Sequence, residues 1–379
     1  MEIKIVKSEE ELKRVHQLRY QCYIEELRWN YPQADLRTKE LGDPMDQFGM
    51  IYYAEDAGRV VATYCIHFGG GFELPGQWRK QYALDRFAEF PETNFSFSSR
   101  LMVLPELRGS TIVARILMRA YEEAWKRGIR FNFCWCRPRL VSLYEQLGFI
   151  RYKDNFLDSS QGYVVPMVLM VEDPQHLNAV RSPFQKICRA HRPSTETAEW
   201  FDRTFPGIRA AATRQLCSPD EFWQHWAAAT DAENVALFQG LTAEQVRALL
   251  DAGVVLQCRA GDRLIREGEA GDEAFLVLSG TVRIYRKNDH GGEHLIGLQS
   301  EGEVFGELAL VSRTLRTATV EAVTDAQLLV ITKDFLLRAM KNQPDIASRL
   351  LFNLSGVLCL KLKETTQRWH AGLNVKSSM

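Results

Sequence analysis

Two charged residues in an apolar stretch raise the first question about chemistry. Residues 305–320 read FGELALVSRTLRTATV, with Glu307 and Arg316 set among leucine, alanine and valine. Charges in such surroundings are costly unless they are paired or held for a ligand. Gly306 allows close approach to the backbone, and a helical turn after it would offer free N–H groups to an anion. A ligand with a phosphate and a hydroxyl group would use all three residues, whereas a Glu307–Arg316 salt bridge across a β-hairpin would need no ligand.

Short β-like runs surround this stretch. From Ala260 the chain reads AGDRLIREGEAGDEAFLVLSGTVRIYRK, with glycines between the apolar runs at Gly261, Gly268, Gly271 and Gly280. Short strands at regular spacing with glycine turns are typical of a barrel or jelly roll. With the FGELAL and RTATV motifs in register, residues 233–365 resemble the cyclic nucleotide-binding domain family.

This resemblance implies a site for a cyclic nucleotide. Arg316 would pair with the cyclic phosphate, and Glu307 would accept a hydrogen bond from the ribose 2′-hydroxyl. Amides near Gly306 and Ala309 would complete the anion site. The nucleotide-binding residues expected are Phe305, Gly306, Glu307, Leu308, Ala309, Arg316 and Thr317. Leu315 departs from the family's usual proline without removing a ligand contact, and Thr317 is compatible with cyclic GMP as well as with cyclic AMP, the default expectation.

In the first half of the chain, a strand, a polar turn and a helix follow one another at residues 101–117. Amides at the N-terminus of such a helix, with the charge of Arg108 beside them, suit a pyrophosphate. A capped surface turn has the same composition, so this segment alone leaves both interpretations open. The second element is LYEQLGFIRY (143–152), which places Tyr144 on a short helix.

Together these two elements resemble the GNAT acyltransferase superfamily over residues 1–170. The resemblance implies that Tyr144 is the general acid that protonates the departing thiolate, while the alternative is a tyrosine of the core. Amides on the strand at 101–104 would polarise the acyl carbonyl. The donor-binding residues expected are Leu101, Met102, Val103, Arg108, Gly109, Ser110 and Thr111.

Two segments resemble one branch of this superfamily more closely. LRYQCYIEELRW (18–29) and SSRLMV (98–103) are similar to the acyl-homoserine-lactone synthases and N-acyl amino acid synthases, which take long acyl chains from acyl carrier protein. Thr111 and Val113 replace small residues of the superfamily's turn, which crowds the backbone and disfavours acetyl-CoA.

The base of the reaction is less defined by the sequence. The synthase branch often has an acidic residue three positions before the strand arginine, where this chain has Phe97. Activation of the amine then falls to water, or to Glu25 or Glu26 of the early helix, which join Tyr144 as candidate catalytic residues. Arg100 either holds the donor or anchors the strand.

Periodicity and turn residues predict the elements that must position these groups. After a capping box at Ser8 and Glu11, we expect a helix, a hairpin, a strand, a helix, a strand, a short helix and a strand, ending near residue 171. Residues 172–232 contain prolines but also aromatic residues, and predict a helical connector packed on one or both domains (Trp200, Phe201, Phe222, Trp223 and Trp226). A terminal helix is expected at 344–367.

The expected fold class is therefore α+β with two domains. Residues 1–171 would form a GNAT-like α/β acyltransferase domain, residues 172–232 the connector, and residues 233–379 a cyclic nucleotide-binding β-barrel of jelly-roll type with its terminal helix.

Composition excludes several classes of partner. A formal net charge of −1 does not favour a nucleic-acid-binding surface. The eight cysteines form no CxxC pair, so no metal site or redox dithiol is expected. The start, MEIKIVKSEEELKRV, lacks the apolar core of a signal peptide, and YVVPMVLMV is too short to span a bilayer, so we expect a cytoplasmic protein with no membrane span.

These observations favour an N-acyltransferase gated by cyclic AMP or cyclic GMP. The donor would be acyl-CoA or acyl carrier protein, and the acceptor a small-molecule amine or a protein lysine that attacks the thioester directly. The alternative is a cyclic-nucleotide-sensing regulatory protein whose GNAT-like domain is inactive. A transcription factor is disfavoured, because no basic helix-turn-helix segment is evident. The sequence does not determine the oligomeric state or whether the nucleotide activates or inhibits.

Overall fold

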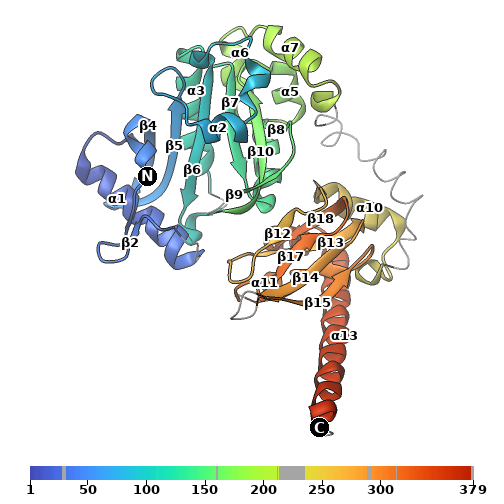
Figure 1. The fold of residues 1–379 in the computed structure, drawn as a ribbon. Helices are drawn as coiled ribbons and strands as arrows, with labels where there is room; N and C mark the ends of the chain where they lie inside the picture. Colours follow the sequence, from blue (N-terminus) through green and yellow to red (C-terminus); the bar gives the residue numbers. More distant parts are fainter. Residues whose placement is uncertain are drawn as a thin grey trace. The chain divides into compact units, whose positions relative to one another are not determined.

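The computed structural model describes residues 1–376 except 28–30, 109, 159–160, 211, 213–234, 288–291 and 313. The chain forms two compact units, Met1–Ser218 and Pro219–Met379 (Figure 1). Each unit has its own sheets and its own core, and each is described here by itself.

A twisted mixed sheet is the centre of the first unit, with strand order β1-β4-β5-β6-β7-β10-β8. Its strands are β1 (Glu2–Ile5), β4 (Gly49–Asp56), β5 (Arg59–Phe68), β6 (Phe95–Val103), β7 (Phe131–Cys136), β8 (Ile150–Arg151) and β10 (Gly162–Met170), while β9 (Phe156–Asp158) pairs with β10. The β6–β7 pair is parallel, and the other pairs are antiparallel. A separate ribbon joins β2 (Ala34–Asp35) to β3 (Glu40–Leu41).

Among the helices of this unit, local signals account for the start of α1 (Glu9–Tyr20) and the end of α4 (Val141–Leu147). Helix α1 continues into a π-helical turn (Gln21–Glu26) and is followed by α2 (Gly76–Gln81) and α3 (Ile112–Lys126). The predicted capping box at Ser8 and Glu11 is present, with the Glu11 amide donating to the Ser8 hydroxyl at 3.2 Å. Gly148, at φ +106°, ends α4 in the left-handed conformation that glycine tolerates. The predicted order of elements is confirmed, and the additions to it are β1, β2, β3, α2, β8 and β9.

Strands β6 and β7 pair over only part of their length. Their ladder ends at the Phe97–Phe133 pair, although β6 continues to Val103 and β7 to Cys136. On its other edge β6 has a bulge, because its pairing with β5 shifts register between Ser99 and Met102. Arg100 lies inside the bulge with φ +54°. A bulge bends its strand, so the second half of β6 turns away from β7.

The first part of the predicted connector belongs to the first unit. Its helices are α5 (Pro174–Ala179), α6 (Gln185–Ala190) and α7 (Glu196–Thr204). Trp200 and Phe205 pack in an aromatic core with Phe87, Phe131 and Phe133. The remaining aromatic residues predicted for the connector, Phe222, Trp223 and Trp226, lie outside the described residues.

Strands of the described part of the second unit form two sheets, as the glycine spacing predicts for a jelly roll. One has the order β11 (Val254–Cys258), β18 (Ala326–Thr332), β13 (Glu273–Ser279), β16 (Val304–Phe305), and the other β12 (Arg263–Ile265), β17 (Thr319–Ala322), β14 (Val282–Lys287), β15 (Glu293–Gln299). Gly280 is at φ +87°, and a Cβ there would lie 2.4 Å from the Asp325 carbonyl oxygen, so this turn requires glycine.

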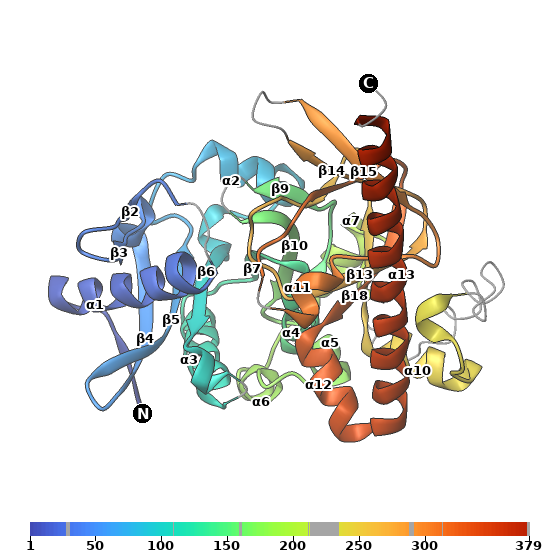
Figure 2. The same cartoon turned by 90° about the horizontal axis from the view of Figure 1, so that it is seen from below.

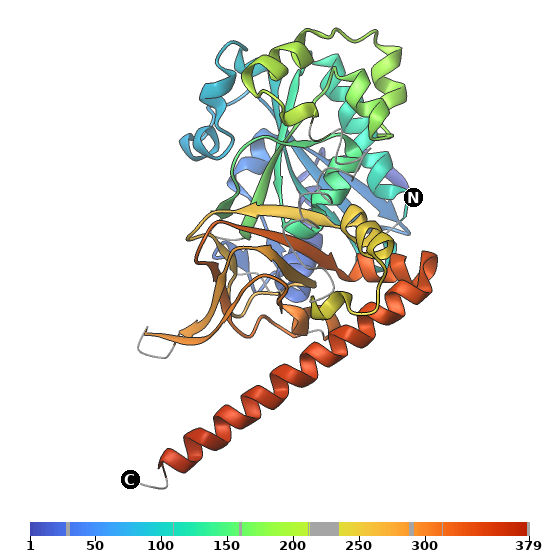
Figure 3. The same cartoon turned by 90° about the vertical axis from the view of Figure 1, so that its right-hand side faces the viewer.

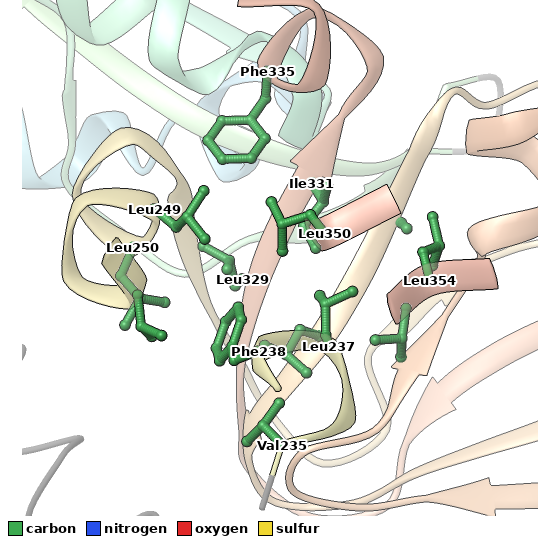
Figure 4. Close-up of a cluster of buried hydrophobic side chains, with 14 of the residues drawn as sticks. Val235, Leu237, Phe238, Leu249, Leu250, Leu329, Ile331, Phe335, Leu350 and Leu354 are labelled. Atoms are coloured by element: carbon green, nitrogen blue, oxygen red, sulfur yellow. The ribbon is translucent and has the colours of Figure 1, made fainter. Parts of the chain in front are cut away.

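Four helices accompany these sheets in the described residues: α10 (Ala243–Ala252), α11 (Glu307–Val311), α12 (Lys333–Asn342) and α13 (Pro344–Lys376). Figure 2 shows α12 and α13 side by side. Helix α13 is longer than the predicted 344–367, and Figure 3 shows it as one continuous helix that projects beyond the strands of its unit. Its first turns are fixed by the core, where Leu350 and Leu354 pack with Leu237, Phe238 and Leu329 (Figure 4).

Candidate functional site

In the second unit, the FGELAL segment forms a strand, a glycine turn and a short helix. Gly306 is at φ +76° and precedes α11. A Cβ at this position would lie 2.9 Å from Nη1 of Arg316 and 3.1 Å from Cδ1 of Ile265. Glycine is therefore what allows the segment to approach the arginine this closely. The first amides of α11 have no partner within the helix, as at any helix start, and are available to an anion.

Arg316 is a buried cation with unused hydrogen-bond donors. Its side chain is 3% exposed. Nη1 donates to the carbonyl oxygen of Gly306 at 2.9 Å, and Nη2 lies 3.4 Å from a carboxylate oxygen of Glu273. Among the described residues, neither Nε nor Nη2 has a hydrogen-bond partner. Since buried donors without acceptors are costly, this arrangement favours a ligand that brings acceptor oxygens, such as a phosphate.

Gly271 lies directly beside the guanidinium group of Arg316. A Cβ on Gly271 would lie 2.5 Å from both Nε and Nη2 of Arg316, the two nitrogen atoms that have no hydrogen-bond partner in the described residues. The glycine spacing of the sequence thus has two roles, because Gly280 shapes a turn whereas Gly271 keeps space beside the guanidinium group.

Glu307 has a different partner from the one that a simple hairpin salt bridge would need. Its side chain is 8% exposed and pairs with Nζ of Lys361 on α13 at 3.0 Å. Arg316 pairs instead with Glu273. The Glu307–Arg316 salt bridge that the sequence left open is therefore not the arrangement of these two residues in this structure.

The other residues expected around the nucleotide divide between core and surface. Phe305 is fully buried and stacks on Phe275 with ring centroids 5.1 Å apart. Ala309 is buried, whereas Leu308 and Thr317 are exposed. Phe305 thus supports the segment from beneath, and the exposed residues are free to face a base or solvent.

In the first unit, a small cavity lies beside the end of the β6–β7 ladder. Apolar groups and aromatic rings line most of it, and Tyr64, Ser98, Asn132 and Tyr144 contribute polar groups (the lining residues also include Leu117, Tyr121, Leu147, Phe149, Leu169 and Phe184). Tyr64 and Ser98 share a hydrogen bond, and Ser98 donates to Asn132 at 2.6 Å. This chain of hydrogen bonds joins the two strands beside the last rung of their ladder.

Tyr144 borders this cavity from α4. Its residue is 8% exposed, and its ring meets the edge of Phe149 at 5.2 Å between centroids. Burial raises the pKa of Tyr144 well above its usual value of 10. The phenol therefore keeps its proton at neutral pH, as a hydrogen-bond or proton donor requires. The packing is also what a core tyrosine would show, so geometry alone does not separate the two roles.

The residues expected to bind the acyl donor follow β6 into the start of α3. Leu101, Met102 and Val103 end β6, and Met102 and Val103 pair with β5. Ser110 and Thr111 are exposed, and Thr111 is the residue before α3. The amide of Ile112 donates to the Ser110 hydroxyl at 3.4 Å, which leaves later amides of the first turn to other acceptors. Gly109 lies outside the described residues.

The candidate bases both have cationic partners. Glu26 pairs with Arg108 at 2.6 Å, so an expected base and an expected donor-binding residue contact each other. Glu25 is exposed and pairs with Lys39 at 2.8 Å. Phe97, which stands where the synthase branch has an acidic residue, is buried and lies against Tyr82 and Phe133. A carboxylate at position 97 would have to enter this aromatic core.

A cluster of buried charges lies near the bulge of β6. Arg19 is fully buried and donates to both carboxylate oxygens of Asp46 at 2.6 and 2.8 Å. His16 also contacts Asp46, at 2.9 Å. Burial raises the pKa of Asp46, but the hydrogen bond from His16 and the charge of Arg19 outweigh it, so the pKa lies well below its usual value.

Arg100 belongs to the same cluster. It pairs with Asp43 at 2.5 Å and donates to the Tyr31 hydroxyl at 3.1 Å. In this structure Arg100 therefore ties its strand to the segment before β4, which is the anchoring role of the two that the sequence left open. Sequence reasoning singled out Arg100 but missed Arg19, Asp43 and Asp46; the available signal was the spacing of two aspartates around a proline in DPMD.

The described residues contain no group of three or more histidine, cysteine, aspartate or glutamate residues arranged to hold a metal ion. None of the helices in the described ranges has the length and apolar character needed to cross a membrane.

Comparison with known families gives a match for each unit. Residues 14–173 match the family model described as N-acyl amino acid synthase FeeM. Residues 255–343 match the cyclic nucleotide-binding domain family. The two matched segments contain the two sites described above, one each.

Individual relatives match the second unit. A cAMP-dependent protein kinase regulatory subunit from Mycosarcoma maydis is 35% identical over 132 residues, which cover 35% of this chain and 24% of the relative. The cyclic AMP receptor protein of Thermus thermophilus is 32% identical over 128 residues, which cover 34% of this chain and 57% of the relative. The crystal structure of the Thermus thermophilus catabolite activator protein is 29% identical with a TM-score of 0.33, covering 36% of this chain and 62% of that one.

The match thus spans less than two thirds of the length of each of these relatives. The family matches lie on separate segments, and each contains the residues that the sequence singled out for its chemistry. The chain carries an N-acyl amino acid synthase domain at residues 14–173 and a cyclic nucleotide-binding domain at residues 255–343.

Proposed function

We propose that this protein is an N-acyltransferase of GNAT type whose acyl transfer is controlled by a cyclic nucleotide. The observation that carries the regulatory half is the buried guanidinium group of Arg316, whose Nε and Nη2 have no hydrogen-bond partner among the described residues. The parting of β6 and β7, with Tyr144 beside it, supports the catalytic half. The acyl group comes from acyl-CoA or acyl carrier protein.

The reaction is a direct transfer from a thioester to an amine. The amine nitrogen attacks the acyl carbon, the carbon–sulfur bond breaks, and the thiolate leaves with a proton from Tyr144. Amides of Leu101, Met102 and Val103 that face away from β5 polarise the carbonyl oxygen. The loop at Arg108, Ser110 and Thr111 holds the pyrophosphate or phosphate of the donor at the start of α3.

The amine must lose a proton, and the candidate acceptors are Glu26, Glu25 and water. Glu26 would act as the base only when it leaves its ion pair with Arg108, which donor binding promotes by offering that arginine a phosphate. Glu25, in the same π-helical turn as Glu26, is the second candidate base. Water is the third candidate acceptor. A small-molecule amine, and an amino acid in particular, is the acceptor that the description of the matched family supports.

In the second unit, the cyclic phosphate binds Arg316 and the amides that start α11, while the ribose 2′-hydroxyl donates to Glu307. This ligand supplies hydrogen-bond acceptors to Nε and Nη2 of Arg316, for which the described part of the chain provides no hydrogen bond. Cyclic AMP is the proposed ligand, since relatives matched by this unit are described as cyclic AMP proteins.

The test uses the full chain and its Arg316→Ala variant. Thiol release is measured with acetyl-CoA, long-chain acyl-CoA and long-chain acyl carrier protein, each with and without cyclic AMP or cyclic GMP. We expect turnover with a long-chain donor, a change on addition of cyclic AMP, and loss of that response in the variant. Because a charge-assisted phosphate contact contributes about 2–5 kcal/mol, the variant should bind nucleotide about 30- to 4000-fold more weakly.

The outcomes separate the rival interpretations. Nucleotide binding without transfer from any donor would favour the inactive regulatory protein. If calorimetry detects no binding of cyclic AMP or cyclic GMP to the wild type, the proposed control by a cyclic nucleotide is wrong. A clear preference for acetyl-CoA would contradict a long-chain donor and favour a protein lysine as the acceptor.

A further inference from the structure

The contact between α13 and the FGELAL segment has no role in the function proposed so far. Lys361 is 54 residues beyond Glu307 in the sequence, and its ammonium group donates to the Glu307 carboxylate at 3.0 Å. It also donates to the carbonyl oxygen of Val304 at 2.5 Å. Val304 and Glu307 flank Phe305 and Gly306, so one ammonium group spans the turn that precedes α11.

Glu307 needs a donor, because a carboxylate that is 8% exposed is costly without one. In this structure the donor is Lys361, whose side chain is 32% exposed. In the proposed complex the donor is the ribose 2′-hydroxyl. Both donors therefore use the same buried carboxylate.

We propose that Lys361 holds the place of the ribose hydroxyl while the site is empty, and that nucleotide binding releases Lys361 and the turn of α13 around it. The inference rests on the proposed nucleotide site. It adds a named residue that lowers the affinity of the site and couples its occupancy to a helix.

The packing of α13 indicates which part of the helix would respond. Ile346, Leu350 and Leu354 are buried in the core, so the first turns stay in place. Leu360 and Leu362, on either side of Lys361, are exposed. Apolar burial therefore contributes little at these two positions, and the ion pair ties this turn to the segment.

The nucleotide itself provides a chemical control. Replacing Lys361 with methionine keeps an unbranched side chain and good helix propensity but removes the ammonium group. Cyclic AMP should then bind about 2- to 5-fold more tightly, because a partly exposed ion pair no longer has to be broken. For 2′-deoxy cyclic AMP, which has no hydroxyl to compete for Glu307, the gain should be smaller.

The experiment measures calorimetric dissociation constants of both nucleotides for the full-length wild type, Lys361→Met and Lys363→Met. Lys363 is an exposed lysine on the same helix and serves as the matched control, with affinities expected within about twofold of the wild type. Amide hydrogen exchange of residues 357–365 is followed in parallel. Cyclic AMP should speed exchange there in the wild type, and Lys361→Met should exchange fast without nucleotide.

Four results would contradict the proposed competition between Lys361 and the ribose hydroxyl. Weaker binding by Lys361→Met would mean that the lysine contacts the nucleotide, and unchanged binding that it does not compete; either overturns the inference while the nucleotide site stands. An equal gain for both nucleotides would show that the hydroxyl is not the competing group. If the wild type binds neither nucleotide, the nucleotide site fails together with this inference, and apo exchange still reports whether the ion pair holds α13.

Discussion

Tyr144 can serve packing and chemistry from the same position, because its ring is buried against Phe149 while its side chain borders the cavity. Its raised pKa means that the hydroxyl is protonated throughout the neutral range. A protonated phenol in a largely apolar cavity stabilises the leaving thiolate more than it would in water, where solvent screens the interaction.

The first prediction at this scale is that Tyr144→Phe lowers turnover by about 10²–10⁴-fold while donor affinity stays near that of the wild type. Removing the hydroxyl leaves the ring packing intact, so the melting temperature should change little. Steady-state thiol release measures the turnover, and titration of a non-reactive donor analogue measures the affinity. Unchanged turnover would leave Tyr144 with a core role only.

The second prediction concerns Asp46. Its replacement by asparagine leaves the fully buried Arg19 without its counter-charge, and breaking such a pair costs about 3–5 kcal/mol. The pKa of Asp46 is lower in the folded protein than in the unfolded chain. The ionised carboxylate therefore contributes its stability above the unfolded pKa of about 4, and this contribution is lost as pH falls below that value.

Thermal unfolding of the wild type and Asp46→Asn at several pH values measures this effect. The gap in melting temperature should be full near pH 7 and should shrink below about pH 4. Asp56→Asn, at an exposed position in the β4–β5 turn, is the control and should change stability little. A gap that does not depend on pH would mean that the carboxylate acts through packing rather than charge.

At the scale of elements, the helices after β10 complete the first unit. Phe184 precedes α6, stacks on Tyr121 of α3 at 4.4 Å between ring centroids, and lines the same cavity as Tyr144. The Ser182 hydroxyl donates to the carbonyl oxygen of Leu147 at 2.6 Å and fixes this segment to the end of α4. A segment that looked like a connector thus closes one side of the cavity that Tyr144 borders.

Phe184→Ala should therefore shift the preferred acyl chain toward greater length, because it removes a ring from the cavity lining. It should also destabilise the fold by about 3–5 kcal/mol. Phe201→Ala removes a ring that is just as buried but that packs with Phe205, away from that lining, and serves as the control for destabilisation alone. Turnover with donors of several acyl chain lengths measures the shift. An identical dependence on chain length in both variants would show that Phe184 does not limit the acyl chain.

At the scale of the whole molecule, the two sites lie in different compact units of one chain. A nucleotide alters acyl transfer only if it binds one state of the protein better than another. The coupling is reciprocal for binding free energies. If cyclic AMP changes the dissociation constant of a non-reactive long-chain donor analogue, the saturating analogue must change the dissociation constant of cyclic AMP by the same factor.

This prediction is checked by calorimetry of each ligand in the absence and presence of the other, with Arg316→Ala as the variant in which the coupling should vanish. A coupling of about 5- to 150-fold is typical of allosteric proteins. A change in turnover without any change in the two affinities would contradict it and would place the regulation in the rate of transfer.

Local rules account for much of this protein. The capping box at Ser8, the end of α4 at Gly148 and the glycine turn at Gly280 each depend on residues a few positions apart. Such local signals let the sequence predict helices α1, α3, α4 and α13 and strands β4, β5, β6, β7 and β10. The FGELAL motif indicated the cyclic nucleotide-binding domain, and the segments LRYQCYIEELRW and SSRLMV indicated the N-acyl amino acid synthase domain; the family matches confirm both. Glu307 and Arg316 could be singled out because charges are unusual in an apolar stretch, whereas Tyr144 was singled out by the resemblance that its motif carries.

The tertiary structure decided which charged residues pair with one another. Glu307 pairs with a lysine 54 residues away, Arg316 lies beside Glu273, and Arg100 meets Asp43 across 57 residues of chain. Local periodicity carries no information about such pairs, because they form only when helices and sheets pack and bring distant charges into the same low-dielectric surroundings. There each charge must find a partner or keep a place for a ligand. The sequence by itself indicated candidate residues for the chemistry, and only packing decided which partners those residues meet.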